Sequence, residues 1–435
     1  MHIKNVLVLG ANGAMGRNVG GLFASFGHAR VYMMCRNLQH AQKACKQAAL
    51  SVKADAILNN LVPCEYSDLA KCASQADLVF ESVVEDAQIK KAILTQLSCC
   101  VPAHTVICTG TSGLPVALLM KALTTEQRRR FLGLHLFNPP YNMPLCELIP
   151  TVDTDPAVTE EISRYAVSTL RRVVVRVKDY PGFLANRIGF YVINDALQQA
   201  EKYKDNGGVD YIDSILGQYT GRNMAPIATA DFVGLDVHKA IVDNLYENTS
   251  DFVNDSFEIP PYVQSLINQN HLGKKTKSGL YQNEILPDGK SQRWVYDIGK
   301  KSYRQEVSYH FPYKEEMIAK IRCGDYMGAF ETLKSNESFE ASLCLEFLLK
   351  YISYSLYCAH EVGMCLTAAD DAMAAGFNWI PPLSLVEALG GKATVMKLMQ
   401  TRLPACFTEA WLMEEALMQA PASNYDFRKY IKGKG

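Results

Sequence analysis

The sequence has no long apolar run, since no window approaches the ~18 consecutive apolar residues that suggest a membrane span. It also has no excess of charge, because 44 basic residues face 45 acidic ones and the formal net charge is −1. Such a balance offers no field to nucleic acid or to an anionic membrane surface. The N-terminus lacks the ordered regions of a leader and enters a strand-like segment at once. We therefore expect a cytoplasmic protein with no nucleic-acid or membrane partner.

The cysteines lack the spacing of a metal site. Thirteen are present, with no Cys-x-x-Cys pair and no His/Cys pattern of zinc ligands, so we predict no metal. Cys108, Cys344 and Cys358 lie in apolar contexts, where a free thiol behaves as a small hydrophobic side chain. We expect the cysteines to be reduced and mostly structural, which suits a reducing compartment.

Short apolar runs alternate with helical patterns through the first 181 residues. The runs predict strands at 6–9, 31–35, 76–81, 105–109, 131–137 and 173–177, with helical patterns after residue 16, over 38–60 and over 86–98. Strands that alternate with helices imply a parallel sheet covered on both faces. The first region is therefore predicted to be an α/β domain.

A glycine turn joins the first strand to the first helix. It reads Gly10-Ala-Asn12-Gly13-Ala14-Met15-Gly16, with Asn12 where the commoner pattern has its second glycine. Glycines here let the backbone approach a pyrophosphate, and the helix N-terminus supplies N–H donors. The turn predicts a Rossmann-type dinucleotide-binding domain over residues 1–181, with these residues at the cofactor. The alternative is a tight turn in some other α/β protein.

The second strand has no acidic residue at its end. A carboxylate there commonly binds the ribose 2′-hydroxyl, but Cys35 occupies the position and Arg36 follows. Arg17 opens the first helix nearby. Two cations suit a 2′-phosphate, which favours NADP, whereas an Arg36 that stacks on adenine or faces solvent is compatible with NAD. Both cofactors stay open at this point.

The chain changes character after residue 181. Helical patterns dominate from there, interrupted over 282–312 by polar sequence that predicts a loop or small hairpin. We expect two all-α domains in tandem, at 182–284 and at 316–435, joined by a polar connection at 285–315.

The two helical regions share a pattern that predicts an internal repeat. The spacing Pro226, Asp231, Gly234 recurs 156 residues later as Pro382, Glu387, Gly390. A helix with Ile212-Asp213 or Ala369-Asp370 precedes each copy. The pattern indicates a duplicated helical domain, and the alternative is coincidence between two proline-capped helices.

Several motifs mark the strand ends and the start of the helical half. They are Thr111-Ser112, Gly133-Leu-His135-Leu-Phe-Asn138-Pro139, Glu147 twelve residues after the histidine, and Pro181-Gly182-Phe-Leu-Ala-Asn186-Arg187. In this order and at these separations they resemble the hallmarks of the L-3-hydroxyacyl-CoA dehydrogenases. The segment 272–281 is also similar to the end of that family's helical domain, and the resemblance covers residues 1 to about 281. The second helical copy resembles the tandem C-terminal halves of the family's large fatty-acid oxidation proteins.

The resemblance implies hydride transfer between the C3 hydroxyl of an L-3-hydroxyacyl-CoA and a nicotinamide cofactor, as in fatty-acid β-oxidation. It implies that His135 is the general base, that Glu147 holds the other ring nitrogen, and that Ser112 and Asn186 bind the substrate oxygen. An imidazole suits this step because the unperturbed histidine pKa lies near ~6.5. The remaining cofactor contacts that the resemblance implies come from Asn138, from Glu85 and Lys90 near the ribose, and from Lys275.

The resemblance also bears on assembly. In the family's simpler members the helical domain pairs with its copy in a second subunit. A tandem pair implies the same pairing inside one chain, so that a monomer is possible, although a dimer is compatible too.

The sequence departs from the family in three places. Gly110 replaces the usual Asn two residues before the serine, the acid after the second strand is absent, and the polar stretch that follows is shorter than the family's CoA-binding hairpin. The last difference leaves two alternatives beside the acyl-CoA enzyme. One is a dehydrogenase of another 3-hydroxy acid, and the other is a catalytically idle relative that binds or supports.

Overall fold

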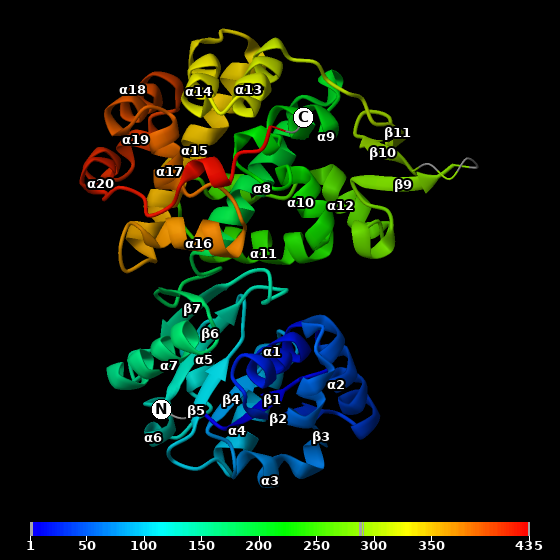
Figure 1. Cartoon of the computed structure of the whole chain (residues 1–435), viewed down its shortest axis with the longest axis vertical. Helices are drawn as coiled ribbons and strands as arrows, with labels where there is room; N and C mark the ends of the chain where they lie inside the picture. The colour runs from blue at the N-terminus through cyan, green and yellow to red at the C-terminus, as the bar shows by residue number, and fades with distance from the viewer. Residues whose placement is uncertain (1–2, 287–288, 290, 434–435) are drawn as a thin grey trace. The chain divides into compact units, whose positions relative to one another are not determined.

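The computed structural model describes residues 3–286, 289 and 291–433. The chain folds into two units, Met1–Phe183 with Val362–Met364, and Leu184–Glu361 with Cys365–Gly435 (Figure 1). The predicted regions 1–181, 285–315 and 316–435 each include a few residues outside this description. Within the described part of the chain, no helix combines the length and the apolar character needed to cross a membrane.

Unit 1 consists of one large sheet and the helices that cover it. Its elements are β1 (Asn5–Leu9), α1 (Ala14–Ser25), β2 (Arg30–Cys35), α2 (Leu38–Val52), β3 (Leu61–Glu65), α3 (Leu69–Ala73), β4 (Leu78–Glu81), α4 (Ala87–Ser98), β5 (Val106–Thr109), α5 (Val116–Met120), α6 (Thr125–Arg128), β6 (Phe131–Leu136), β7 (Leu145–Pro150), α7 (Pro156–Ser168) and β8 (Val173–Arg176).

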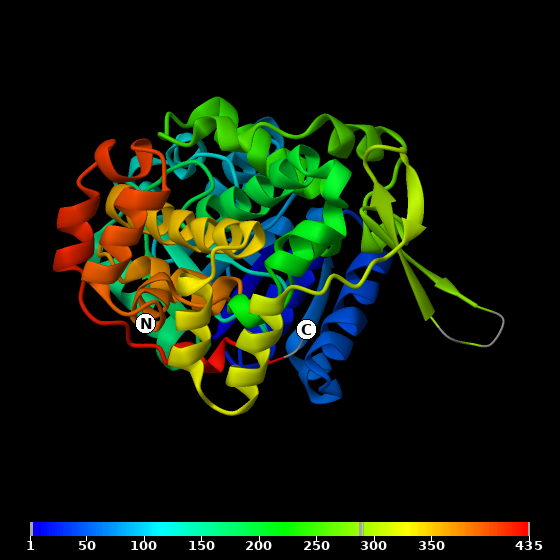
Figure 2. The same ribbon diagram turned by 90° about the horizontal axis from the view of Figure 1, so that it is seen from above.

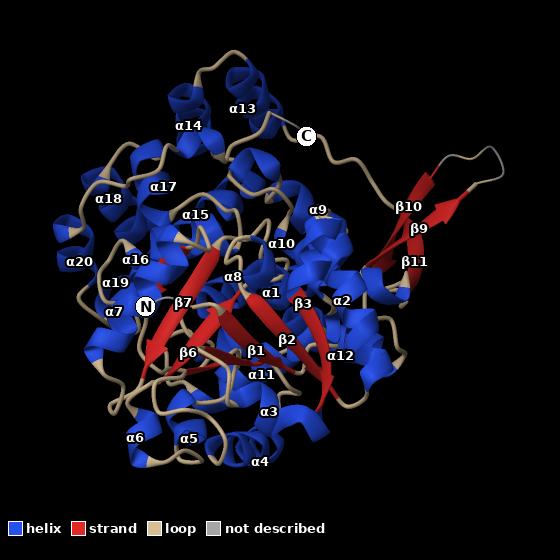
Figure 3. Cartoon of the chain, turned by 60° about the horizontal axis from the view of Figure 1, so that its bottom comes forward, coloured by secondary structure: helices blue, strands red, loops and turns tan. Residues whose placement is uncertain are grey.

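The strand order is β3-β2-β1-β4-β5-β6-β7-β8. Figure 3 labels β3, β2, β1, β6 and β7 of this sheet. All neighbours are parallel except β6 and β7, which are antiparallel. The order reverses direction between β1 and β4, and ligands of such sheets bind outside the carboxyl ends of the strands at this switch point. The predicted parallel sheet is confirmed, and two strands that the sequence analysis did not predict, β3 and β7, complete it.

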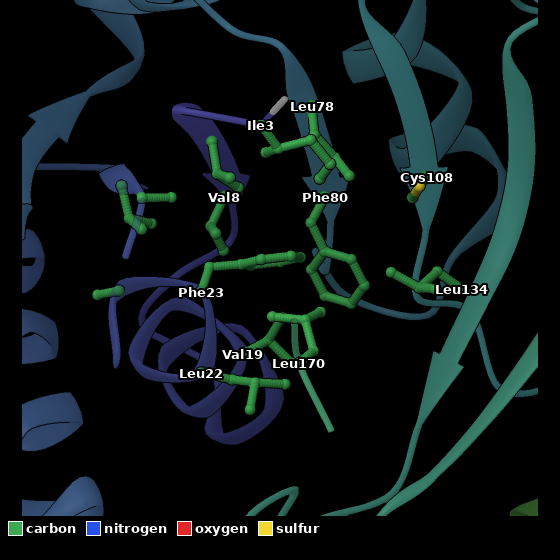
Figure 4. Packing of buried hydrophobic residues seen from close by; sticks show 14 of the residues in the cluster. Ile3, Val8, Val19, Leu22, Phe23, Leu78, Phe80, Cys108, Leu134 and Leu170 are labelled. Atoms are coloured by element: carbon green, nitrogen blue, oxygen red, sulfur yellow. The ribbon is translucent and has the colours of Figure 1, made fainter. Parts of the chain in front are cut away.

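The packing of unit 1 explains why its strands are almost wholly apolar. Val8, Phe80 and Leu134 project from three strands toward α1, where Val19 and Phe23 face them (Figure 4). Because helices cover both faces, strand residues are buried on both sides, and alternation of polar and apolar residues is lost.

Unit 2 is dominated by helices, as expected. Its elements are α8 (Ala185–Lys202), α9 (Val209–Ile215), α10 (Pro226–Val233), α11 (Leu235–Asn248), α12 (Pro261–Asn268), β9 (Tyr281–Ile285), β10 (Ser291–Asp297), β11 (Ser302–Gln305), α13 (Pro312–Arg322), α14 (Tyr326–Ser335), α15 (Phe339–Glu361), α16 (Ala368–Gly376), α17 (Pro382–Ala388), α18 (Lys392–Arg402), α19 (Cys406–Glu409) and α20 (Met413–Gln419).

Of the two alternatives predicted for 282–312, a loop or a small hairpin, the described residues form the hairpin and add a third strand. Together the strands form a three-stranded antiparallel sheet in the order β11-β10-β9, and Figure 2 shows its β9–β10 hairpin extending away from the helices. Arg293 explains part of this order, because its guanidinium lies 3.7 Å over the ring of Tyr281 and pairs with Glu306 at 3.1 Å. The polar composition had left a loop and a small hairpin open, and such cross-strand contacts stabilise polar strands.

The two helical copies are built around matching buried aspartates. Asp213 accepts the N–H groups of Ile227 and Ala228 at 2.9 and 2.8 Å, at the start of α10. Asp370 accepts the N–H of Leu383 at 2.9 Å, at the start of α17. Each carboxylate thus satisfies the open N–H groups of a proline-led helix.

Each of these aspartates also accepts one hydroxyl from a later segment of its own copy. Tyr281 donates to Asp213 at 2.8 Å, and Ser423 donates to Asp370 at 2.5 Å. Burial raises the pKa of each carboxyl to about 7 despite these hydrogen bonds, which lower it. The same arrangement at two places supports the predicted repeat, whose boundaries stay a prediction.

The two copies meet at corresponding positions. Arg222 and Trp379 form an isolated antiparallel bridge, beside which Ile380 donates to the carbonyl of Gly221 at 2.7 Å. Helix α8 packs on α15 and α16, while α15 also packs on α9. Mutual contacts of this kind are those expected of a two-fold pair.

Candidate active site

The glycine turn lies between β1 and α1, where the strand order reverses. Gly10 has a φ of +78°, and a Cβ there would come within 2.4 Å of the carbonyl oxygen of Ser82. A Cβ on Gly16 would come within 2.5 Å of the Gly10 oxygen. Both positions therefore require glycine, which brings the backbone of the turn against the end of β4.

The predicted pyrophosphate site lies at the N-terminus of α1. This helix begins at Ala14 with no side-chain cap and no acidic residue in its first turn. Asn12, Gly13 and Ala14 are exposed and Met15 is half-buried. The open N–H groups and the positive end of the helix dipole fit a pyrophosphate, so the residues present suit a dinucleotide.

Tyr66, which the sequence analysis did not identify, lies near the end of β2, where the cofactor ribose is predicted to bind. Cys35 on β2 pairs with Glu65 on β3, so Arg36 and Tyr66 leave neighbouring strands at the same level. Burial raises the pKa of Tyr66 to about 12, whereas Gly10 N–H and Arg36 lower it, which puts the phenol beside the glycine turn. Because β3 was not predicted, nothing in the sequence pointed to this residue.

The two arginines near the ribose end differ in their surroundings. Arg36 is exposed at the end of β2. Arg17 donates to the side-chain oxygen of Gln47 on α2 at 3.1 Å. Arg36 is therefore the more accessible of the two cations for a phosphate.

His135 and Glu147 face each other across the antiparallel pair β6–β7. They are direct partners in the register, and cross-strand partners project to the same face. The Nδ1 atom of His135 lies 2.7 Å from Glu147 Oε2, with 4% and 0% of the two residues exposed. The twelve-residue separation in the sequence is thus the path through one antiparallel turn.

Ser112 completes a hydrogen-bonded chain with this pair. Its Oγ lies 3.1 Å from His135 Nε2. The rings of Phe137 and Phe183 lie 4.7 and 5.3 Å from the imidazole, measured between centroids. The aromatic rings shield the imidazole from water on these sides, which strengthens its electrostatic contacts.

Glu85 accepts hydrogen bonds from residues 111–113, which we call the Ser112 loop, and Lys90 pairs with Glu85. Lys90 is 1% exposed, and its ammonium lies 2.8 Å from Glu81, 3.2 Å from the Val83 carbonyl and 3.2 Å from Glu85. An ammonium has three donors. A direct bond from Lys90 to a ribose would therefore replace one of these internal contacts.

The family's missing asparagine at Gly110 has a steric explanation. A Cβ at this position would come within 2.6 Å of the ring of Phe80 and 3.2 Å of the carbonyl oxygen of Glu81. The Phe80 ring belongs to the core, so it occupies space that a side chain at 110 needs. A larger side chain at this position would therefore require the Phe80 ring to move.

Asn138 connects the loop after β6 to the helix after the glycine turn. Its side-chain oxygen accepts from Asn18 Nδ2 at 2.8 Å, and Asn18 lies on α1. This hydrogen bond ties the loop after β6 to α1, and the cofactor contact predicted for Asn138 stays a prediction.

Asn186 and Lys275 belong to unit 2, whereas Ser112, His135 and Glu147 belong to unit 1. Asn186 is the second residue of α8 and is 6% exposed. Lys275 forms an ion pair with Asp236, and its side chain is 43% exposed. Their predicted contacts with substrate and cofactor stay predictions.

His238, which lies outside this site, has structural surroundings. His238 is fully buried and hydrogen-bonds Asn194 at 2.9 Å, and burial lowers its pKa to about 3. No cluster of three His, Cys, Asp or Glu side chains suited to a metal occurs among residues 3–286, 289 and 291–433.

Two family models match the chain. The "3-hydroxyacyl-CoA dehydrogenase, NAD binding domain" matches residues 5–180, and the "3-hydroxyacyl-CoA dehydrogenase, C-terminal domain" matches residues 182–283. The glycine turn and the side chains of Ser112, His135 and Glu147 fall within the residues that the first model matches.

Relatives of known sequence and structure agree with these models. A probable 3-hydroxyacyl-CoA dehydrogenase of Deinococcus radiodurans is 31% identical over 295 residues, which cover 65% of this chain and 83% of that protein. A probable 3-hydroxyacyl-CoA dehydrogenase of Bacillus subtilis is 28% identical over 366 residues, and the match spans only 45% of its length. The crystal structure of Escherichia coli 3-hydroxybutyryl-CoA dehydrogenase has a TM-score of 0.71 at 19% identity and covers 96% of this chain and 99% of that one. At this identity the last similarity shows the fold alone.

Proposed function

Because the chain belongs to the 3-hydroxyacyl-CoA dehydrogenase family, we propose that it oxidises the C3 hydroxyl of an L-3-hydroxyacyl-CoA to the 3-oxo group. The observation that carries the proposal is the hydrogen-bonded chain from Glu147 through His135 to Ser112. It lies in the domain whose family model describes NAD binding.

The tautomer of the imidazole follows from the position of Glu147. The carboxylate accepts a hydrogen bond from the N–H group at Nδ1. The neutral ring then has its lone pair on Nε2, which is the acceptor on the side of Ser112. When the hydroxyl proton arrives, the carboxylate stabilises the imidazolium. Glu147 thus acts through His135 without touching the substrate.

The substrate hydroxyl fits at the Ser112 side of Nε2. His135 removes its proton, and Ser112 donates a hydrogen bond to the oxygen as it becomes a carbonyl. Asn186 is proposed as a second donor to this oxygen, by its place in the motif that opens α8. A bound oxidised nicotinamide supplies the acceptor for the hydride that leaves C3.

The cofactor is proposed to be NAD, with NADP admitted through Arg36. The open N-terminus of α1 and the glycine turn support pyrophosphate binding. The exposed Arg36 at the end of β2 supports binding of a 2′-phosphate.

The thirteen free cysteines support a reducing location such as the cytoplasm.

An absorbance assay of cofactor oxidation tests the proposal. The purified chain is mixed with acetoacetyl-CoA and with either NADH or NADPH, and the expected result is turnover that depends on both reactants. Turnover with free 3-oxo acids but not with the CoA ester would favour a dehydrogenase of another hydroxy acid. No turnover with any of them, in a folded protein, would contradict the enzyme and favour an idle relative.

A further inference from the structure

Ser112 lies in the irregular connection between β5 and α5, so no helix or strand fixes its backbone. Glu85, from the segment before α4, does so instead. Its Oε1 accepts the hydroxyl of Thr111 at 2.5 Å and the N–H groups of Ser112 and Gly113 at 2.9 and 3.0 Å. One carboxylate oxygen thus binds three consecutive residues of the loop.

The Glu85 carboxylate is held in turn by Lys90. Lys90 lies 3.2 Å from its other oxygen, and Lys90 is anchored at 2.8 Å by Glu81, which is fully buried. Burial acts to raise the pKa of Glu85, but Lys90 and the three hydrogen bonds together lower it below its ordinary value. Glu85 therefore stays ionised near neutral pH and keeps all three loop donors satisfied.

A second carboxylate fixes the far end of the same connection. Asp179 accepts the N–H groups of Val116 and Ala117 at 2.9 and 2.8 Å, at the start of α5. Between these anchors, Ser112 Oγ lies 3.1 Å from His135 Nε2. The distance depends on the loop backbone, because a hydroxyl on a single rotatable bond follows its Cα.

We propose that Glu85 is a positioning residue that holds the Ser112 hydroxyl on the imidazole of His135. The proposal rests on the proposed function and adds a role for Glu85 that differs from a ribose contact. A displacement of about 1 Å at a catalytic group can cost about 100-fold in rate. Loss of Glu85 should therefore lower kcat and leave cofactor affinity nearly unchanged.

Kinetics of Glu85→Ala and Glu85→Gln, each alone and combined with Ser112→Ala, form the first test. Glu85→Ala should lower kcat about 10- to 100-fold, and Glu85→Gln should lose less because its amide oxygen still accepts N–H groups. On the Ser112→Ala background either change should cost under about 3-fold, since residues that act as a unit are not additive. Multiplying effects, or a change confined to the cofactor Kd measured by NADH fluorescence, would overturn the proposal.

The matched control is Asp86→Asn, because Asp86 is adjacent to Glu85 and its side chain caps α4 by accepting the N–H groups of Gln88 and Ile89. Asparagine keeps the cap, so this variant should have the parent's kcat. Loss of activity in the control equal to that of Glu85→Ala would assign the effect to α4 and contradict the proposal.

Nitrogen NMR of the imidazole in the free protein gives a readout that needs no turnover. Glu85→Ala and Glu85→Gln should move the Nε2 resonance of His135 in the direction that Ser112→Ala moves it, and Asp86→Asn should not. A shift in a protein without dehydrogenase activity would keep the positioning role and reject the proposed function. An unmoved Nε2 resonance in a folded Glu85→Gln protein would reject the positioning role itself.

Discussion

Replacing Glu147 with glutamine removes a charge and almost no volume, so the variant isolates the electrostatic part of its role. The carboxylate is fully buried and lies 2.7 Å from His135 Nδ1. A hydrogen bond to a charged group is worth ~1.5–3 kcal/mol. Since each 1.36 kcal/mol changes a rate about tenfold, Glu147→Gln should lower kcat by roughly 10- to 150-fold.

The orientation of the new amide sets which end of that range applies. If the amide oxygen faces Nδ1, the imidazole keeps its tautomer and loses only the stabilisation of the imidazolium. If the amide nitrogen faces Nδ1, the proton moves to Nε2, which then has no lone pair for the substrate proton. The loss of kcat is larger in the second case.

Steady-state kcat and an NADH fluorescence titration check this prediction. The cofactor Kd should stay within about twofold of the parent, because Glu147 acts through the imidazole. Glu126→Gln on the exposed first turn of α6 serves as the matched control and should behave as the parent. An unchanged kcat with a weakened cofactor Kd would refute the assignment of Glu147 to His135.

Three further changes have equally direct outcomes. His135→Gln should lower kcat by about 10²–10⁴ with an unchanged circular dichroism spectrum, as expected for loss of a general base; parent-like turnover would end that assignment. Arg36→Asp should shift the NAD/NADP ratio of kcat/KM toward NAD, and an unchanged ratio would show that Arg36 does not bind the ribose. Burial raises the pKa of Asp213 to about 7, so its contribution to stability is full below about pH 4 and is lost as pH rises through 7. Asp213 should therefore lower the parent's free energy of unfolding by about 1.4 kcal/mol per pH unit between pH 5 and 7. In urea unfolding, Asp213→Asn should remove this part of the pH dependence, and a parent-like dependence would contradict the prediction.

The pairing of His135 with Glu147 was predictable from the sequence although the strand that aligns them was not. The motif around His135 and the position of Glu147 pointed to their partnership, but β7 is a short apolar run like many buried segments. Its pairing with β6 is antiparallel, an exception in a parallel sheet, and periodicity carries no sign of strand direction. The contact between the two side chains was thus predicted without the strand geometry that produces it, and their catalytic roles stay predictions.

The missed strand β3 shows a different limit. Pro63 stands in its middle, and proline argues against a strand because it has no N–H to donate. Here β3 is the edge of the sheet, where one side of the strand needs no partner. Tyr66, which follows it, was missed for the same reason, and the contacts of Glu85 with a loop 26 to 28 residues later depend on the tertiary fold.

Pairing of the two helical copies accounts for the extensive burial of α8. Most of its residues are buried, including the run from Ala185 to Leu197. A Cβ on Gly189 would come within 2.1 Å of the ring of Phe377 on the loop after α16, so the approach is close. Tyr191 lies with its ring 4.3 Å from that of Tyr354 on α15. A helix buried all round has no face left for solvent.

Deleting the chain after about residue 315 should therefore expose α8 and make the remaining protein dimerise or aggregate. The tether supplies the second copy at an effective concentration of roughly millimolar, which outcompetes pairing between chains at ordinary protein concentrations. The full chain should accordingly elute as a monomer in light-scattering chromatography, while the truncated chain should show a dimer or larger species and a lower Tm. Refolding the truncated chain with a separately produced 316–435 fragment should restore the smaller species, because the fragment covers the same face. A truncated chain that stays monomeric, soluble and as stable as the parent would show that α8 does not need this cover.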